Sequence, residues 1–233
     1  MEQHRVLAHD EWIEARKALL AKEKDFTRQR DDLSRERREL PWEAVTKEYF
    51  FDGPKGKQTL SELFDGRSQL IVYHFMFDPA WDEGCPNCSF WADNFDPNVV
   101  HLDARDVAMI AVSRAPFAKL DSYKQRMGWS FKWVSSFNSD FNFDLGVSFA
   151  AEQTETEGFY NYEMQPNHAP EREGMSVFYK DADGGVFHTY SAYARGIDMF
   201  NTAYHYLDCV PRGRDEEGRE VLYWVRRHDE YSR

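Results

Sequence analysis

Cysteine is scarce in this chain, with only three among 233 residues. So few thiols cannot form the framework of several disulfides that stabilises small secreted domains. Long apolar runs are missing as well. The longest, residues 70–77, is interrupted by a histidine and is far too short to cross a bilayer. The sequence therefore predicts neither a disulfide-stapled domain nor a membrane-spanning segment.

Positive charge is also in deficit, because 29 Lys and Arg stand against 41 Asp and Glu, which gives a formal net charge of −12. Such an acidic chain is repelled by phosphate backbones and anionic lipid surfaces, so we expect neither nucleic acid nor a membrane as a partner. The first twelve residues lack the apolar segment and cleavage site of a secretory signal, and we therefore expect a cytoplasmic protein. With 42% apolar and 16% aromatic residues, the chain can nevertheless form a large core.

We expect two parts: an N-terminal amphipathic helical arm at residues 1–41 and a domain at residues 42–233. The arm is highly charged, and its apolar residues recur every seven positions up to Pro41. Because the positions that would complete a coiled-coil seam are charged, the pattern predicts a helix lying on its own domain or on a second copy. A homodimer through this helix is one interpretation. The recurring apolar residues are Trp12, Leu19, Phe26, Leu33 and Leu40.

The expected elements of the second part follow a familiar order: strand, helix, strand, helix, antiparallel hairpin and closing helix. This is the order of a thioredoxin-like α/β fold, in which helices flank a central mixed sheet. Residues 139–172 are expected to be a long irregular insertion before the hairpin, and residues 221–225 an apolar segment that docks back. The strands are expected at residues 70–77 and 107–112, the helices at 85–96, 113–128 and 197–207, and the hairpin at 175–190.

Two histidines lie within these predicted strands. His74 interrupts the apolar run and His188 lies in the hairpin, and for both we expect a core residue rather than a catalytic base. Val186, His188 and Tyr190 alternate along the sequence, so we expect them to share one face of their strand.

Cys85 and Cys88 are separated by two residues, at the expected start of a helix that leaves a buried strand. The thiolate is the reactive form of cysteine, and the free N–H groups and dipole of a first helical turn favour negative charge. We therefore expect Cys85 to be the nucleophile and Cys88, one turn further on, the resolving thiol. Pro86 suits an early helical position. Three acidic residues close before Cys85 would oppose thiolate formation, and the sequence leaves that balance open.

Seven segments between about residue 5 and residue 231 resemble the signature stretches of an uncharacterised bacterial family, predicted to be thioredoxin-like dithiol–disulfide oxidoreductases. The resemblance implies the fold and a thiol redox role for Cys85 and Cys88, and it implies no particular substrate. The segments are GCPNCSFWAD, HLDARDVAMIAVSRAP, YKQRMGW, WVSSFNSDFNFD, GMSVFYKDADGGVFHTYSAYARGID, LDCVPRGRDE and WVRRHDEY.

The chain departs from better-known relatives. Thioredoxins have a Trp directly before the first cysteine and a cis-proline facing the disulfide, whereas here the nearest Trp is Trp81 and Met175 falls at the proline position. Reduction of ordinary protein disulfides is therefore disfavoured. Peroxiredoxins carry Pro and Thr seven and three residues before the reactive cysteine, where this chain has Asp78 and Asp82. We do not expect a peroxiredoxin-type mechanism.

Candidate substrate-binding residues are Trp81, Pro86, Arg114 and Met175. Arg114 follows the second predicted strand, at the edge of an open α/β sheet where ligands bind. We expect a disulfide or another oxidised-sulfur substrate, an unidentified reductant and no cofactor. Two alternatives stay open. One is a binding or scaffold module without turnover, and the other is a Cys-held metal, for which His101 lies at a superficially suitable spacing but a fourth ligand is absent.

Overall fold

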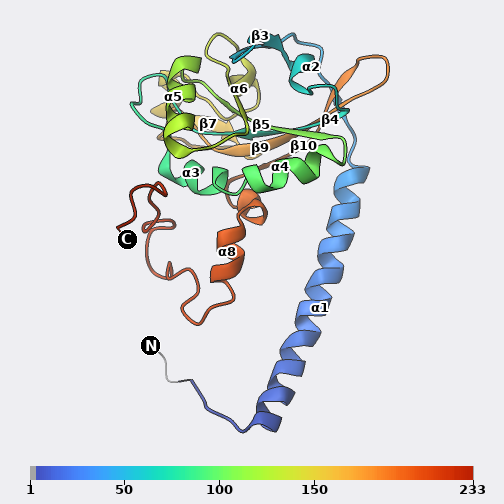
Figure 1. The fold of residues 1–233 in the computed structure, drawn as a ribbon, viewed down its shortest axis with the longest axis vertical. Coiled ribbons are helices and arrows are strands. Elements are labelled where there is room, and N and C mark those ends of the chain that lie inside the picture. Colours follow the sequence, from blue (N-terminus) through green and yellow to red (C-terminus); the bar gives the residue numbers. More distant parts are fainter. Residues whose placement is uncertain (1–3, 233) are drawn as a thin grey trace. The chain divides into compact units, whose positions relative to one another are not determined.

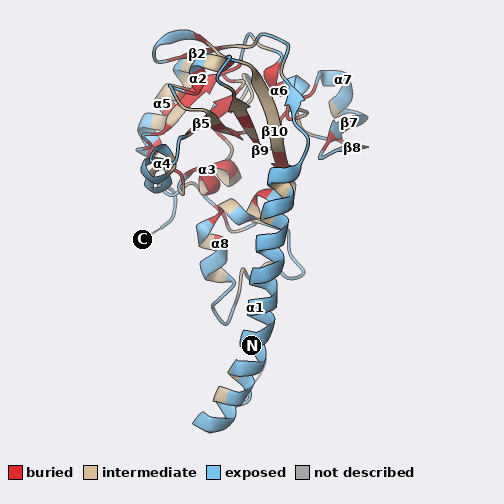
Figure 2. Cartoon of the chain, turned by 90° about the vertical axis from the view of Figure 1, so that its right-hand side faces the viewer, coloured by how far each residue is buried: buried red, intermediate tan, exposed pale blue. Residues whose placement is uncertain are grey.

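The computed structural model describes residues 4–232 and divides into two compact units, Met1–Pro41 and Trp42–Arg233. The first unit consists mainly of α1 (His9–Glu39), which ends just before Pro41 because a proline disfavours helical geometry in the residue that precedes it. Its side chains are mostly exposed, as Figure 2 shows, including Phe26 at 65%. The interpretation of the heptad-spaced residues as a dimer contact stays a prediction.

The second unit is built on an eight-stranded mixed sheet in the order β1-β10-β9-β4-β5-β6-β2-β3 (Figure 1). The pairs β4–β5 and β5–β6 are parallel, and the other neighbours are antiparallel. This arrangement confirms the predicted thioredoxin-like fold. The strands of the sheet are β1 (Glu43–Ala44), β2 (Phe50–Gly53), β3 (Gly56–Thr59), β4 (Gln69–His74), β5 (Val107–Ser113), β6 (Lys132–Ser135), β9 (Gly174–Lys180) and β10 (Val186–Tyr193).

Helices cover both faces of this sheet. Because successive strand residues point to opposite faces, β4 directs Leu70 and Val72 into one buried cluster and Tyr73 into another. The cluster around Tyr73 is strongly aromatic and packs beneath α3, which Figure 1 shows beside α4 along one side of the sheet. The helices are α2 (Leu60–Leu63), α3 (Pro86–Ala92), α4 (Asp96–Asp103), α5 (Phe117–Met127), α6 (Phe141–Asp144), α7 (Ala151–Thr154) and α8 (Thr202–Leu207), with a 3₁₀ helix η1 (Ala194–Phe200).

Several elements differ from the sequence-based expectation. Helix α4 was not expected, because Pro97 in the sequence indicates only the end of the preceding helix. Proline is also favoured in the first turn of a helix, and Pro97 lies in the first turn of α4. The closing helix is split into η1 and α8, because Asn201 is extended and its side chain caps α8 by accepting from the N–H of Tyr204. The insertion is not irregular throughout. It holds α6, α7 and a hairpin of β7 (Glu157–Tyr160) and β8 (Glu163–Pro166).

The predicted common face of Val186, His188 and Tyr190 is wrong. The register of β10 against β9 shifts between His188 and Tyr190, so Tyr190 packs against the opposite cluster from Val186. Alternation alone cannot reveal such a bulge. His74 is buried with Nε2 2.8 Å from the Ser176 hydroxyl, and burial lowers its pKa to about 3. It therefore stays neutral in the core.

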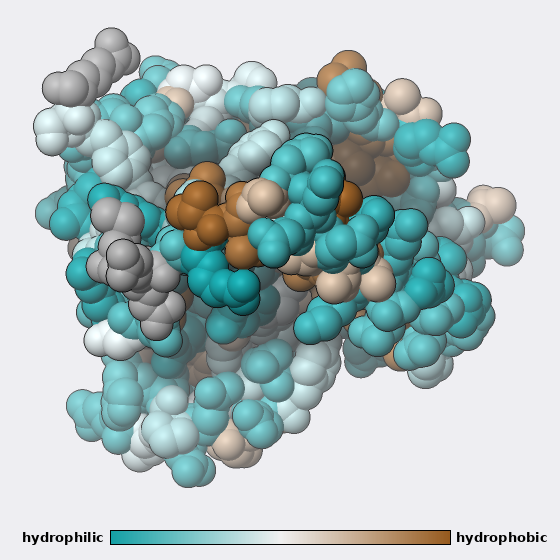
Figure 3. Space-filling view, turned by 90° about the horizontal axis from the view of Figure 1, so that it is seen from below, coloured by the Kyte–Doolittle hydropathy of each residue, from teal (hydrophilic) through white to brown (hydrophobic). Residues whose placement is uncertain are grey.

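The face of the molecule seen in Figure 3 carries mostly hydrophilic side chains, and apolar ones gather in smaller patches. This agrees with the excess of charged residues in the composition. Within residues 4–232, no helix has the length and apolar character needed to cross a membrane.

Candidate functional site

Cys85 is the N-cap of α3, and Pro86 opens the helix. The loop that leads into it is fixed by the backbone, since the N–H of Cys85 donates to the carbonyl of Met76 at 3.1 Å. Gly84 lies so close to Phe75 that a β-carbon there would stand 2.8 Å from the ring. The tryptophan found before the first cysteine of thioredoxins could not occupy this position without moving the core.

The two cysteines are free thiols with opposite pKa shifts. The Cys88 thiol donates a hydrogen bond to Cys85, and this contact, with the N–H groups of Asn87 and Cys88, lowers the pKa of Cys85 although burial opposes it. Burial raises the pKa of Cys88, and the negative charge on Cys85 raises it further. Cys85 is therefore the first of the two to become a thiolate.

The acidic loop before Cys85 does not reverse this order. Glu83 forms ion pairs with Arg126 and Arg227, and the Arg227 pair is 2.9 Å long. Arg227 also donates a hydrogen bond to the carbonyl of Gly84 at 2.9 Å. These cations offset the charge of Glu83. The balance that the sequence left open thus favours the thiolate at Cys85, because its hydrogen-bond donors are in direct contact with it.

A pocket of about 320 Å³ opens at the cysteine pair, within the range of small-ligand sites. Helix α3 supplies Cys85, Asn87, Cys88 and Trp91, and the indole of Trp91 donates to the carbonyl of Ile197 at 2.9 Å, which fastens η1 to α3. The other residues that line the pocket are Tyr73, Met76, Arg172, Glu173, Ala194, Arg195, Ile197, Asp198, Tyr204, Val221 and Leu222.

The C-terminal segment forms one wall of this pocket. The Glu216 carboxylate accepts hydrogen bonds from the Tyr204 hydroxyl at 3.0 Å, the Leu222 N–H at 3.0 Å and the Trp224 indole at 2.9 Å. Val225 is 3% exposed. The predicted docking of residues 221–225 is therefore confirmed, and one partly buried carboxylate, that of Glu216, holds the segment in place.

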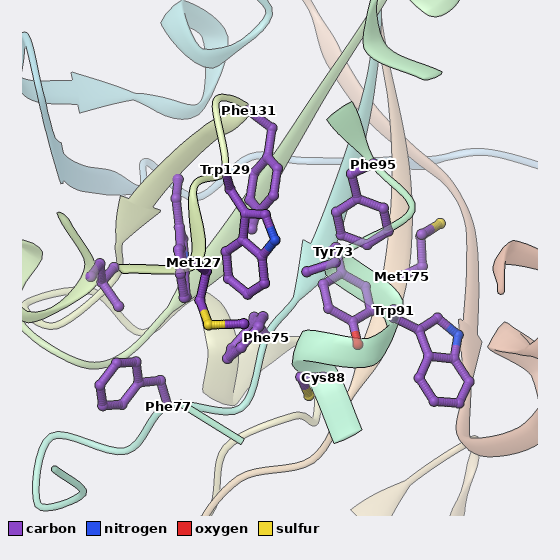
Figure 4. Packing of buried hydrophobic residues seen from close by; sticks show 14 of the residues in the cluster. Tyr73, Phe75, Phe77, Cys88, Trp91, Phe95, Met127, Trp129, Phe131 and Met175 are labelled. Atoms are coloured by element: carbon purple, nitrogen blue, oxygen red, sulfur yellow. The ribbon is translucent and has the colours of Figure 1, made fainter. Parts of the chain in front are cut away.

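Two polar groups of the pocket have no partner of hydrogen-bonding geometry among the described residues. The hydroxyl of Tyr73 points toward Cys88, as Figure 4 shows, and burial raises its pKa well above the ordinary value, so it keeps its proton. The carboxylate of Glu173 forms no hydrogen bond or ion pair with residues 4–232, and its charge raises the pKa of both cysteines. Sequence reasoning missed both residues, because Tyr73 stands in an apolar run and no motif surrounds Glu173.

The structure does not bring the other predicted binding residues to the pocket wall. Met175 is 1% exposed and packs in the core, because it lies opposite Tyr73 in the sheet. Trp81 packs against the edge of the same cluster, and its carbonyl accepts from Lys119 at 2.8 Å. Pro86 lies in the first turn of α3. A role for these residues in substrate binding stays a prediction.

Arg114 takes part in a separate buried cluster. Its guanidinium donates to Glu171 at 3.3 Å and lies 4.5 Å from the ring centre of Phe143. Glu171 also accepts from the Ser148 hydroxyl at 2.8 Å. Burial raises the pKa of Glu171 to about 8, although both donors oppose the shift. Arg114 is thus occupied by a carboxyl of its own chain.

The predicted metal alternative finds no further ligands. Among residues 4–232, no three His, Cys, Asp or Glu side chains are grouped as a metal ion would require. His101 therefore does not join the two cysteines in such a group. Cys209 is exposed, its thiol donates to the carbonyl of His205 at 3.3 Å, and it does not line the pocket.

Fold and site together define a thioredoxin-like protein with a pair of thiols at the start of a helix. The chain belongs to the family described as "Bacterial protein of unknown function (DUF899)", whose model matches residues 1–231, and the resemblance noted from the sequence is thereby confirmed. No curated protein matches it.

Solved structures similar to this chain include two proteins of low identity. One is peroxiredoxin Q from Xanthomonas campestris, at 15% identity over 70% of this chain and 95% of that one, with a TM-score of 0.47. The other is peroxidoxin BcpB from Mycobacterium tuberculosis, at 14% identity over 70% and 94%, with a TM-score of 0.42. At this identity the likeness concerns the fold alone.

Proposed function

We propose that this protein is a thiol–disulfide oxidoreductase in which Cys85 attacks a disulfide and Cys88 resolves the intermediate. One observation carries the proposal: Cys85, the N-cap of α3, and Cys88, one turn further on, both line a pocket large enough for a ligand, and the contact with Cys88 lowers the pKa of Cys85. A nucleophile and the group that displaces its product thus stand side by side. This is the requirement of dithiol exchange.

In the first step, the Cys85 thiolate attacks one sulfur of a substrate disulfide. The substrate S–S bond breaks, one thiolate leaves and takes up a proton, and Cys85 is joined to the other half of the substrate. The negative charge at Cys85 disappears with this step. Two of the causes that raise the pKa of Cys88, the hydrogen bond to Cys85 and its charge, disappear as well.

In the second step, Cys88 loses its proton to water and attacks the sulfur of Cys85. The N–H of Met76, which donates to the Cys88 sulfur at 3.4 Å, stabilises the new thiolate. The second substrate thiol leaves, and the Cys85–Cys88 disulfide forms. Two electrons have then passed from the protein to the substrate, and an external dithiol must return them.

Single cysteine variants test this mechanism. Cys85→Ser should abolish exchange with a small disulfide, because the nucleophile is gone, whereas Cys88→Ser should accumulate a mixed disulfide at Cys85, measured as an added mass on the intact protein. Cys209→Ser is the matched control and should react like the wild type. Full turnover in both pocket variants would contradict the mechanism.

A redox titration separates this enzyme from the predicted binding module. The enzyme requires a reversible two-electron couple of Cys85 and Cys88, measured against a series of glutathione or dithiothreitol buffers. If the wild type shows no such couple while its fold stays intact, the pair does not turn over. The chain would then be a binding module that retains the thioredoxin-like fold.

A further inference from the structure

The pocket at the cysteine pair has the dimensions of a small-molecule site. Its volume of about 320 Å³ suits a ligand of low molecular weight. Its walls are fixed, because Trp91 binds the carbonyl of Ile197 and Glu216 holds the tail at Leu222. Figure 1 shows α8 and the C-terminal segment on the same side of the sheet as α3, consistent with these contacts. A ligand here meets walls on several sides rather than an open groove.

Two of the four charged residues that line the pocket neutralise each other. Asp198 lies 3.3 Å from Arg195 and 2.9 Å from Arg214, so its charge is offset twice. The side chain of Arg195 is largely exposed to solvent. These residues leave little net charge for a ligand to meet.

Arg172, the third charged residue, is engaged with its own segment. Its guanidinium lies 5.6 Å from the ring centre of Tyr160, and its Nε donates to Asn167 at 3.3 Å. Glu173, the fourth, is held in place by its backbone, since its carbonyl accepts from the Tyr160 hydroxyl at 2.8 Å. Glu173 lines the pocket, its carboxylate has no partner among residues 4–232, and its charge raises the pKa of both cysteines.

The unpaired carboxylate of Glu173 is available to a cation supplied by a ligand, which would form charge-assisted hydrogen bonds with it. The hydroxyl of Tyr73 is a second unsatisfied group, on a side chain that is fully buried and directed toward Cys88. Both groups line the pocket at the cysteine pair. A ligand is therefore expected here that brings a positive charge to Glu173 and a disulfide sulfur, as a weak hydrogen-bond acceptor, to Tyr73, close to Cys85 and Cys88.

We infer that the substrate is a small disulfide with a positively charged amino group, which binds Glu173 while its sulfur meets Cys85. The inference rests on the proposed function and names the substrate class of that site. The reaction is the one described above: the protein dithiol is oxidised to the Cys85–Cys88 disulfide, and one disulfide is reduced to two aminothiols. A bound cation would also offset the charge by which Glu173 raises the pKa of Cys85, so the substrate itself promotes thiolate formation.

Three small disulfides of similar size test the inference on the reduced wild-type protein. They are cystamine, which is cationic, bis(2-hydroxyethyl) disulfide, which is neutral, and 3,3′-dithiodipropionate, which is anionic. The second-order rate of protein oxidation is measured for each and divided by the rate with a neutral model dithiol, because leaving thiols differ in acidity. We expect the normalised rate with cystamine to be about tenfold higher than that with the neutral disulfide, because one charge-assisted hydrogen bond contributes an effect of about this size.

Glu173→Gln should remove this preference. Its rate with the neutral disulfide should rise by about twofold, because loss of the carboxylate lowers the pKa of Cys85. Glu173→Lys should reverse the preference and favour the anionic disulfide. The matched control is Glu83→Gln, which changes the net charge equally at a paired residue outside the pocket, and it should keep the cystamine preference.

The outcomes separate the inference from the function on which it rests. Equal normalised rates with all three disulfides, or a cystamine preference that persists in both Glu173 variants, would overturn the inference and leave dithiol exchange standing. If the wild type reduces none of the three, the proposed function fails and the inference fails with it.

Discussion

Two glutamates before β9, Glu171 and Glu173, are close in sequence and opposite in surroundings. Glu171 is 1% exposed, and its carboxyl accepts from Arg114 at 3.3 Å and from Ser148 at 2.8 Å. Glu173 lines the pocket, faces the cysteines and has no side-chain partner within residues 4–232. A buried acid whose partners belong to its own chain serves the fold, whereas an acid without partners is available to a ligand.

The first glutamate positions the second. Glu171 pairs with Ser148 in an isolated β-bridge, and the N–H of Arg172 donates to the carbonyl of Val147 at 2.8 Å. The insertion is thereby joined to the segment that leads into β9. Glu173 follows directly, so the position of its backbone is set by these contacts and by the Tyr160 hydroxyl, which donates to its carbonyl.

Removal of the two acids in turn should separate their roles. Glu171→Ala should lower the free energy of unfolding by about 3 kcal/mol, because Arg114 and Ser148 lose their acceptor inside the protein. Glu173→Ala should change it by less than about 0.5 kcal/mol, since no contact is lost. Urea denaturation of the two variants measures both values. Equal losses would mean that Glu173 is as structural as Glu171.

The pH dependence of stability sharpens the comparison. The pKa of Glu171 is raised to about 8 from 4.5, so folding takes up a proton between these values and the contribution of this group to stability falls as pH rises from about 4.5 to 8. Glu171→Gln keeps an acceptor for both donors but cannot titrate. Relative to this variant, the wild type should lose roughly 1 kcal/mol per pH unit in that interval.

Chemical denaturation at several pH values between 5 and 8 checks this expectation. Parallel stability curves for the wild type and Glu171→Gln would show that Glu171 titrates in the same range when folded and unfolded.

The dithiol motif could be predicted from the sequence because its signals are local. The spacing of Cys85 and Cys88, the early Pro86 and the preceding apolar run all lie within one short stretch, and together they predict where α3 begins. The order of strands and helices likewise follows from apolar patterns along the chain. These features depend on residues that are neighbours in sequence, so they can be predicted without knowledge of the tertiary structure.

The rest of the site could not be predicted because it depends on contacts between distant segments. Arg114 was expected near a ligand, but its partner Glu171 comes from the insertion 57 residues later. Tyr73 reads as one more core aromatic until the sheet directs it toward Cys88. The bulge after His188 likewise turns Tyr190 to the face of the strand opposite to the one that the alternating pattern predicted. Satisfied and unsatisfied polar groups become distinguishable only once the fold is known.

Two tyrosines of the pocket region differ as the two glutamates do: one has hydrogen-bond partners and the other has none among residues 4–232. This pair gives the smallest predicted effect. Tyr160 donates to the carbonyl of Glu173 at 2.8 Å and accepts from the N–H of Ala194 at 2.9 Å, whereas the hydroxyl of Tyr73 has no partner of hydrogen-bonding geometry. Tyr160→Phe should therefore cost about 1 kcal/mol of unfolding free energy, and Tyr73→Phe should cost nothing or stabilise slightly. Urea denaturation measures both, and a loss at Tyr73 as large as that at Tyr160 would mean that its hydroxyl already has a partner. Tyr73→Phe should also slow exchange with cystamine. A slower exchange at unchanged stability would show that the Tyr73 hydroxyl acts on the ligand rather than on the fold.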